Sequence, residues 1–292
     1  MLAFITSLRH PRNSTDYAGV ERLLLDSLHS VMRQHHPDFS VWVVGNRRPE
    51  QLPDAVNWVG VDFPAPSEVR GPITGREAVL LDKGTKLAVG LLAARASAPD
   101  HVMLFDADDM VSNRLAGLSA AAPGADGWRI VDGWRWSSER RAVRRQHEFH
   151  RHCGTAFIVR PDHFALPDAL GPDADQAELQ EAFGERLFRH IGSHRHLSAD
   201  LAAEGHPLEP IGFTAALYRV GTGENHSGVS LGGFGRPVGR AMADEFGVAA
   251  TRWTPPGLAR SILPGRRALE RFPVVRELRA RFPRGSASAP RS

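Results

Sequence analysis

Residues 101–109 have the sequence HVMLFDADD, in which an apolar run ends in three carboxylates. The run 102–105 is typical of a strand buried on both faces, so the acids stand where the strand leaves its sheet. Carboxylates one residue apart supply the hard oxygen ligands that Mg²⁺ and Mn²⁺ prefer, and such ions keep positions open for phosphate oxygens. We therefore predict that Asp106 and Asp108 bind Mn²⁺ or Mg²⁺. The alternative is that Asp108 or Asp109 caps a following helix, although a cap needs only one acid.

Length and composition indicate one large α/β domain. The chain has 292 residues, of which 42% are hydrophobic, enough to bury a substantial core. Its single cysteine, Cys153, excludes an internal disulfide framework and fits a reducing compartment. We find no apolar stretch of the roughly 20 residues that a membrane span needs, and the N-terminus is too short for a signal sequence. The expected location is cytoplasmic.

Positive charge is concentrated at the C-terminus. Residues 252–292 contain ten arginines and two glutamates, so the formal +3 of the chain leaves the preceding part acidic. Apolar residues alternate with these arginines, a mixture that can place an amphipathic helix on an anionic membrane surface. The alternative is a helix packed on the body with its arginines in solvent, and residues 285–292 look disordered. Nucleic-acid binding is not expected, because only this tail is basic.

The N-terminal half alternates between strand and helix patterns. Strands are predicted at 2–6, 40–44, 56–61 and 102–105, and helices at 20–34 and 81–95. This order implies a mostly parallel sheet with helices on its faces, whose ligands bind at the carboxyl ends of the strands. After residue 125 the pattern is mixed. It predicts a Trp-rich hairpin over 128–136, a strand at 155–159, and helices near 178–190 and 197–205.

These features together resemble a nucleotide-sugar glycosyltransferase of the GT-A fold, similar to family 2. The resemblance spans about residues 1–235 and depends on the Rossmann-like half, the Asp106-Ala107-Asp108 motif and His226 in a Gly-rich turn. It implies that Asp106 contacts the ribose or the metal, that Asp108 holds the metal joining both phosphates, and that His226 completes the coordination. It also implies a GT-A domain over 1–250, with a donor half (1–125) and an acceptor half (126–250), before the tail 251–292.

Further candidate donor contacts lie at the predicted strand ends and on the second helix. Lys83 and Lys86 are the only lysines in a chain with more than thirty arginines, and an ammonium near this edge could neutralise a diphosphate. The alternative is an ordinary exposed helix start. Thr6, Arg9 and Asp62 stand where the resemblance places base and ribose contacts. Relatives often carry an acidic pair after the second strand, where this chain has Asn46, so the nucleotide stays open, with UDP favoured.

The general base of an inverting transfer is predicted from the segment before the last expected helix of the acceptor half. Where relatives carry a Glu-Asp pair, this chain has Ser193-His194-Arg195-His196. A histidine can accept a proton near neutral pH, so His194 or His196 is the candidate, and the alternative is a structural role for both. The cluster of His147, Glu148, His150 and His152 could line an acceptor site or form a polar loop. Trp128, Trp134 and Trp136 could stack on a sugar or pack in a half-buried strand.

The sequence thus predicts a metal-dependent, hexosyltransferase-like enzyme that uses a nucleoside diphosphate sugar. Its acceptor would be a hydroxyl of a glycan or a lipid-linked intermediate, as in surface polysaccharide synthesis. Two alternatives stay open. One is a phosphatase of the haloacid dehalogenase type, with Asp106 as nucleophile, although Met110 and the absence of any lysine after Lys86 depart from that motif. The other is a non-catalytic nucleotide- or glycan-binding protein on the same fold.

Overall fold

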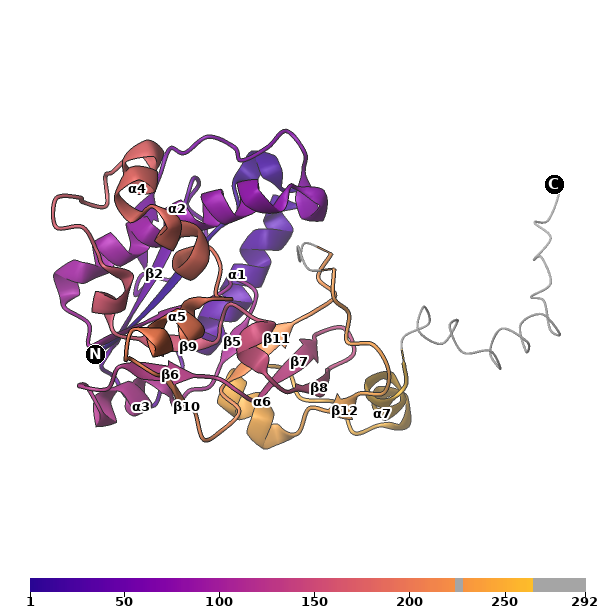
Figure 1. Ribbon diagram of the computed structural model, residues 1–292. Coiled ribbons are helices and arrows are strands. Elements are labelled where there is room, and N and C mark those ends of the chain that lie inside the picture. Colours follow the sequence, from indigo (N-terminus) through magenta and orange to yellow (C-terminus); the bar gives the residue numbers. More distant parts are fainter. Residues whose placement is uncertain (224–227, 265–292) are drawn as a thin grey trace, which may run out of the picture.

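The computed structural model describes residues 1–223 and 228–264, which form two β-sheets with helices around them (Figure 1). The larger sheet has seven strands in the order β10-β6-β9-β4-β1-β2-β3. Their bounds are Leu2–Ser7 (β1), Phe39–Gly45 (β2), Asn57–Gly60 (β3), His101–Leu104 (β4), Gly127–Arg129 (β6), Phe157–Val159 (β9) and Glu209–Pro210 (β10). Strands β3, β2, β1 and β4 run parallel, whereas β9 is antiparallel to both β4 and β6. The predicted α/β fold with a mostly parallel sheet is confirmed.

The smaller sheet has five strands in the order β12-β8-β7-β11-β5. Their bounds are Met110–Val111 (β5), Gly133–Ser137 (β7), Ala142–Gln146 (β8), Ala216–Arg219 (β11) and Arg236–Pro237 (β12). Strand β5 begins directly after Asp109 and pairs antiparallel with β11. The acidic loop 105–109 therefore connects the last parallel strand of one sheet to the edge of the other.

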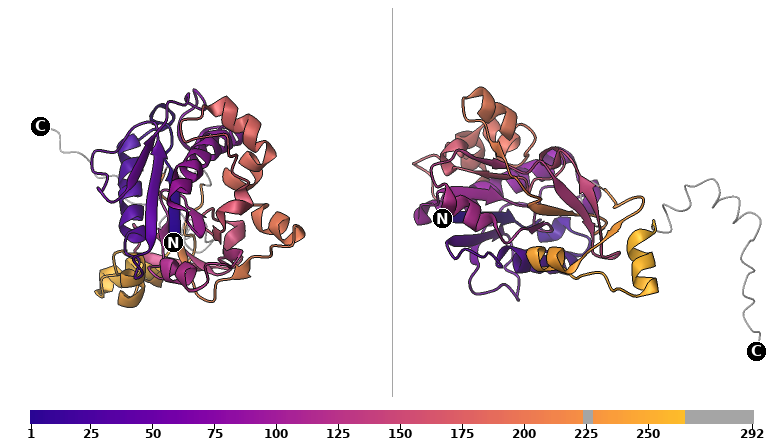
Figure 2. Two further views of the ribbon diagram at one scale, coloured as in Figure 1. Left: turned by 90° about the vertical axis from the view of Figure 1, so that its left-hand side faces the viewer. Right: turned by 90° about the horizontal axis from the view of Figure 1, so that it is seen from below.

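Helices cover both faces of the larger sheet. The α-helices are α1 (Tyr17–Val31), α2 (Arg76–Ala94), α3 (Leu115–Ala121), α4 (Gln176–Phe183), α5 (Leu197–Ala203), α6 (Arg240–Phe246) and α7 (Pro255–Ile262). Short 3-10 turns are η1 (Pro11–Asn13), η2 (Gly71–Ile73), η3 (Arg95–Ser97), η4 (Phe149–Arg151) and η5 (Pro161–Phe164), and η6 (Leu187–Ile191) is a π-turn. The left view of Figure 2 shows the indigo strands between α1 on one side and α2 on the other.

The two long helices form where local sequence and burial agree. Asp16 caps α1 by accepting from the Gly19 N–H at 2.8 Å, and the helix buries Val20, Leu24 and Leu28 at helical spacing. In α2 every residue from 84 to 92 is buried, because the helix lies between the sheet and η6. The helix begins at Arg76, earlier than its apolar periodicity predicts, and its first residues, Arg76 and Glu77, are exposed.

The predicted Trp-rich hairpin over residues 128–136 is wrong. Trp128 lies in β6 of the larger sheet, whereas Trp134 and Trp136 lie in β7 of the smaller one. Residues 130–132 carry the chain between the sheets, and Ile130 N donates to Ala156 O at 2.8 Å. Alternating apolar residues predict that strands exist, but they do not choose the partner of each strand. All three indoles are 5–7% exposed, so they pack in the two cores, and the sugar-stacking alternative is not supported.

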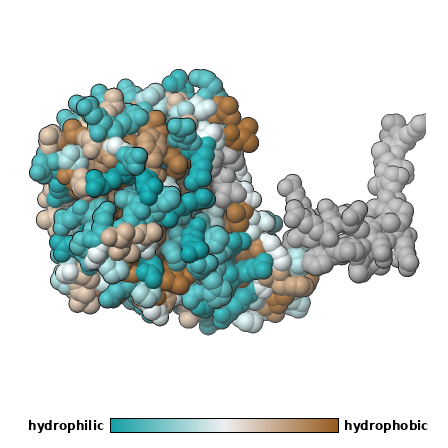
Figure 3. Space-filling model, viewed as in Figure 1, coloured by the Kyte–Doolittle hydropathy of each residue, from teal (hydrophilic) through white to brown (hydrophobic). Residues whose placement is uncertain are grey.

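The described beginning of the basic tail packs on the body. Ser261, in α7, is fully buried, and its hydroxyl donates to Arg140 O at 3.0 Å. The Arg140 guanidinium in turn donates to Gly232 O at 3.0 Å and Ser261 O at 3.1 Å. Ile262 and Leu263, at the end of α7, are 39% and 49% exposed, and Figure 3 shows apolar surface near this end. Residues 265–292, with the predicted disordered end, lie outside the described residues. No helix in the described part of the chain is long and apolar enough to cross a membrane.

Candidate functional site

The loop 105–109 is held in place from both sides by hydroxyl groups. Thr6, at the end of β1, donates from Oγ1 to Phe105 O at 2.7 Å, and the Asp106 N–H donates to Thr155 Oγ1 at 2.9 Å. The Asp109 N–H donates back to Asp106 O at 3.0 Å, which closes a tight turn. Because β5 follows at once and α3 begins only at Leu115, neither Asp108 nor Asp109 caps a helix. The capping alternative is therefore excluded.

Asp109 is fully buried at the junction of the two sheets. Its Oδ2 accepts from Thr155 Oγ1 at 2.6 Å and from Cys153 Sγ at 2.9 Å, and its Oδ1 accepts from the Arg219 N–H of β11 at 3.0 Å. Burial, and then the charges of Asp108 and Asp106, raise the pKa of Asp109 well above its usual range. This acid therefore organises the loop, a role that sequence reasoning missed because all three carboxylates look alike in the motif.

Asp106 and Asp108 line an open cleft of about 1360 Å³ at the carboxyl ends of β1 and β4. This position matches the general rule for ligand sites on parallel sheets. The cleft is also lined by residues at the end of β1, in α1, α2 and β11, and in the loops 152–154 and 192–195, including Ser7, Arg9, Arg76, Lys83, His152, His194, Arg195 and Tyr218. A second hollow of about 550 Å³ shares Ser7, Arg9, Lys83 and Asp106 with the cleft and extends to Asn13 and Pro66. Residues from seven segments of the chain are thus brought together at the cleft.

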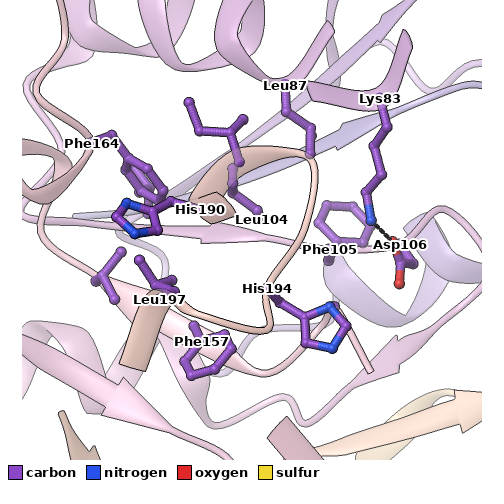
Figure 4. Close-up of a pocket in the computed structure, with 14 residues that line it drawn as sticks. Lys83, Leu87, Leu104, Phe105, Asp106, Phe157, Phe164, His190, His194 and Leu197 are labelled. Carbon is purple, nitrogen blue, oxygen red and sulfur yellow. Dashed lines mark hydrogen bonds and ion pairs between the residues drawn. The ribbon is translucent and has the colours of Figure 1, made fainter. Parts of the chain in front are cut away.

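The charges in this cleft are unevenly balanced. Lys83 reaches from α2 to form an ion pair with Asp106, as Figure 4 shows. Although burial raises the pKa of Asp106, the charge and hydrogen bond of Lys83 outweigh it, so the pKa is lowered. Burial and the charge of Asp106 raise the pKa of Asp108 to about 6, against the opposing effect of Arg219. Lys83 therefore neutralises Asp106, whereas burial and the charge of Asp106 disfavour the ionised form of Asp108.

Asp106 and Asp108 are better suited to hold a divalent ion than the neighbouring thiol of Cys153. One oxygen or sulfur atom from each of Asp106, Asp109 and Cys153 lies within 4.8 Å of the others. However, burial raises the pKa of the Cys153 thiol well above its ordinary value, and Asp109 already accepts three hydrogen bonds. Asp106 and Asp108 both line the cleft, and carboxylate oxygens are the hard donors that suit Mn²⁺ or Mg²⁺. His226, the predicted third ligand, lies outside the described residues.

The two lysines have different environments. Lys83 is 28% exposed and faces the cleft, whereas the Lys86 side chain is fully buried. Lys86 Nζ donates to Asp82 Oδ2 and to Leu8 O, both at 2.9 Å, and burial lowers its pKa despite Asp82. Lys86 therefore ties α2 to the chain after β1, and its direct contact with a ligand stays a prediction without structural support.

His194 enters the cleft because two backbone segments pack unusually closely. A Cβ at Gly192 would stand 2.5 Å from Leu80 O of α2, and one at Gly84 would stand 2.9 Å from Leu187 O of η6. The glycines let η6 approach α2, and the chain after η6 then places His194 beside Asp106 (Figure 4). Burial and Lys83 lower the pKa of His194 to about 4, against the opposing charge of Asp106. The imidazole is neutral near pH 7, and its Nε2 is buried without a hydrogen-bond partner among the described residues.

Replacing Gly192 by alanine should displace His194. Because the nearest atoms to the new Cβ are backbone carbonyl oxygens, α2 and η6 must move apart, at a cost of roughly 1–3 kcal/mol in the free energy of unfolding. Urea denaturation measures this cost. Gly212→Ala is the matched control, because a Cβ there meets no atom within 4 Å. Equal stability of the two variants would show that the close approach of η6 to α2 is not required.

The remaining predicted site residues are dispersed. Arg9 lines the cleft, but the Thr6 side chain is enclosed in the sheet, and Asp62 is exposed and lines neither the cleft nor its extension. Asn46 donates to Phe63 O at 2.9 Å, and its Oδ1 is buried without a partner among the described residues. His196 is exposed at the start of α5 and does not line the cleft. Of the histidines considered as bases, only His194 is brought to the acids.

The cluster around His147 is also divided by the fold. His152 lines the cleft, whereas His147 is exposed and its Nδ1 lies 2.7 Å from Asp132 Oδ1. His150 packs edge-on against Phe157, with ring centroids 6.3 Å apart. These histidines are therefore close in sequence, but the fold does not bring them together in one site. Arg76, Gly154 and Tyr218, which the motif search did not single out, do line the cleft.

Comparison with known proteins identifies no family. No family model matches the chain, and no curated protein matches it. Among solved structures, it is similar to residues 1–349 of TarS from S. aureus, with 14% identity, a TM-score of 0.38 and coverage of 75% of this chain and 60% of that one. It is also similar to the apo-form glycosyltransferase GlyE from Streptococcus pneumoniae TIGR4, with 10% identity, a TM-score of 0.29 and coverage of 72% and 44%.

The chain therefore spans less than two thirds of either structure. With TM-scores below 0.5, neither likeness establishes the fold or an activity for this protein. The fold described above rests on the order and direction of the chain's own strands.

Proposed function

We propose that this protein is a metal-dependent glycosyltransferase of the GT-A type, similar to family 2. It would transfer a sugar from a nucleoside diphosphate sugar, with UDP-sugars favoured, to a hydroxyl acceptor. The observation that carries the proposal is that Asp106, Asp108 and Lys83 line one open cleft at the carboxyl ends of parallel strands. A phosphate-bearing ligand needs cations at such a place, and the cleft combines an ammonium with two acids able to hold a second cation.

The diphosphate would bind between α2 and the acidic loop. Lys83 and Arg9 line both the main cleft and its extension towards Asn13, so the extension is the natural place for the nucleoside. Lys83 is already oriented by Asp106, which reduces the entropy lost when it donates to a phosphate oxygen. Asp106 and Asp108 would hold Mn²⁺ or Mg²⁺, with His226 as the proposed third ligand. When bound, that ion would offset the charge of the departing diphosphate.

His194 is the proposed group that accepts the proton of the acceptor hydroxyl. It lies beside Asp106, it is neutral near pH 7, and its buried Nε2 has no partner among residues 1–223 and 228–264. A neutral imidazole can accept a hydrogen bond from a hydroxyl and orient it for attack, which here requires that the buried Nε2 become accessible to the acceptor. His196 is not included, because it lies outside the cleft wall.

The acceptor side of the proposal is less specific. The acceptor would be a glycan or a lipid-linked intermediate, and the enzyme would work in the cytoplasm. Peripheral contact of the basic C-terminal residues with an anionic membrane would suit a lipid-linked acceptor. Comparing vesicle binding of the full chain with that of a chain ending at residue 264 tests this contact. Unchanged binding would contradict it.

Calorimetric titration tests the donor class directly. UDP, GDP and their sugars are titrated into the full chain with Mn²⁺ and with EDTA, and release of nucleoside diphosphate from the tightest sugar is then followed. The proposal expects one preferred nucleotide, bound only with metal, and slow turnover. Binding without turnover for any acceptor would favour the non-catalytic alternative. If no nucleotide binds under either condition, the glycosyltransferase proposal fails, and phosphate monoesters should be tested as substrates of the phosphatase alternative.

The two lysines should separate ligand binding from stability. Lys83→Met should weaken nucleoside diphosphate binding about 10- to 100-fold, because it removes a charge-assisted hydrogen bond. Lys86→Met should instead lower the free energy of unfolding by about 3–5 kcal/mol, because Asp82 is left buried without its counter-charge. Calorimetry and urea denaturation of both variants measure the two effects. The reverse pattern would place the ligand at Lys86.

A further inference from the structure

A second group of potential metal ligands lies apart from the cleft. It consists of Asp126, which precedes β6, His163 in η5, and His206, which lies between α5 and β10. None of the three lines the cleft or its extension. Residues separated by as many as 80 positions are thus brought together by the fold, and no sequence motif joins them.

The donor atoms converge on one point. One ligand atom from each residue lies within 4.8 Å of the others. Asp126 Oδ1 is 3.2 Å from His206 Nδ1 and 3.3 Å from His163 Nε2. The two imidazole rings are tilted by 50°, with centroids 4.9 Å apart. Asp126 and His206 are partly exposed, at 38% and 47%, so an ion from solvent can reach them.

His163 supplies an independent indication of a ligand. Its side chain is only 8% exposed, and its Nε2 is aimed into the cluster. Despite the short distance to Asp126, this buried nitrogen makes no hydrogen bond of acceptable geometry. Most buried polar atoms in proteins form a hydrogen bond. The unpaired Nε2 of His163, which faces two other potential metal ligands, therefore points to a bound ion.

We propose that Asp126, His163 and His206 bind a zinc ion. Two imidazole nitrogens and one carboxylate oxygen are a donor set that suits Zn²⁺, whereas Mg²⁺ and Mn²⁺ prefer oxygen ligands. With three protein ligands, a water molecule takes the fourth tetrahedral position. The set also differs from the proposed ligands in the cleft, where two of the three are carboxylates.

The zinc ion would hold the edge of the larger sheet. Strand β10 has two residues and pairs only with β6 in the described sheet, which makes it a weak edge strand. The Asp126 carbonyl also accepts from the Arg160 N–H at 3.2 Å, so the start of β6 is already tied to the chain before η5. An ion bridging all three segments would fix the connection from α5 to β10. Its binding energy would add to the stability of this edge.

Zinc titration of the full chain tests the proposal. The metal-free protein is titrated calorimetrically with Zn²⁺, and Co²⁺ is used as a visible-absorbing substitute. We expect one site, a Kd at least about 100-fold weaker in His206→Ala and in Asp126→Asn, and loss of the Co²⁺ spectrum in both. At Zn²⁺ about 100-fold above Kd, the Tm of the wild-type protein should rise by roughly 5 °C.

Two controls make the result specific. His147→Ala removes an exposed histidine that also pairs with one aspartate, so it should leave the zinc Kd unchanged. Asp108→Asn tests whether zinc binds in the cleft instead. The proposal is overturned if no saturable binding occurs, if binding survives both site variants, or if it is lost in Asp108→Asn. Circular dichroism of each metal-free variant confirms that it is folded.

Discussion

Asp108→Asn is expected to abolish metal-dependent nucleotide binding while making the metal-free protein more stable at pH 7.5. The amide keeps the shape of the side chain but removes the charge that the ion requires. Burial and the negative charge of Asp106 disfavour the ionised form of Asp108, and Arg219 and Lys83 only partly compensate. The variant therefore removes the charge repulsion at Asp108, which stabilises the fold, and also removes the carboxylate proposed to bind the metal ion. Such an exchange of activity for stability is common at functional sites.

The stability gain should depend on pH. The folded-state pKa of Asp108 is raised from 3.8 to about 6, so ionisation destabilises the fold as pH rises through this interval. The penalty is absent below about pH 4 and complete above about pH 6, where it amounts to roughly 1–3 kcal/mol. Thermal unfolding in EDTA at pH 4.5 and pH 7.5 measures the difference. A control, Asp168→Asn at an exposed carboxylate, should show no gain.

An equal Tm for Asp108→Asn and wild type at pH 7.5 would contradict the assigned electrostatics. Retained Mn²⁺-dependent nucleotide binding in the same variant would contradict the assigned ligand. The two measurements are independent, because the Tm is measured on the metal-free protein and nucleotide binding is measured in the presence of Mn²⁺.

Asp109→Ala is expected to destabilise the fold strongly. It would leave the Thr155 hydroxyl, the Cys153 thiol and the Arg219 N–H buried without their acceptor, at the point where the two sheets join. We expect a loss of about 3–5 kcal/mol in the free energy of unfolding, enough to unfold a marginal domain. Urea denaturation or, where the variant is insoluble, yield of folded protein measures this loss.

Asp109→Asn distinguishes a structural role from a metal-binding one. Its amide oxygen can still accept hydrogen bonds, and burial already favours the neutral acid at this position. We therefore expect the asparagine variant to lose less than half as much stability as the alanine variant, and to keep metal-dependent nucleotide binding. Loss of nucleotide binding in a stable Asp109→Asn protein would instead make Asp109 a ligand of the ion.

Much of the parallel sheet and the place of the acidic loop could be predicted from sequence. The run 102–105 is continuously apolar, as expected of a central strand, and β4 does lie between β1 and β9 in the sheet. The regions after residue 125 were harder, because β6, β7 and β9 have only three to five residues each. Helix α4 also ended earlier than expected. Gly184 has a φ of +52°, which stops the helix before η6 begins.

The candidate site shows the same division. Lys83 and Lys86 are three residues apart in a helix, and nothing local decides which one faces the cleft. His194 reaches the acids only because glycines at 84 and 192 let two backbones approach. Asp106, Asp108 and Asp109 have the same chemistry in the motif. Packing then makes two of them walls of a cleft and encloses the third.

The amino-acid sequence by itself determined the α/β class, the strand that precedes the acids and the presence of a carboxylate pair at a strand end. These follow from apolar periodicity and from residue type, which act locally. Tertiary structure alone decided the environment of each side chain: the burial of Asp109 and Lys86, the raised pKa of Asp108, and the meeting of Asp126 with His163 and His206. Burial and electrostatic coupling depend on which distant segments pack together, and no local pattern carries that information.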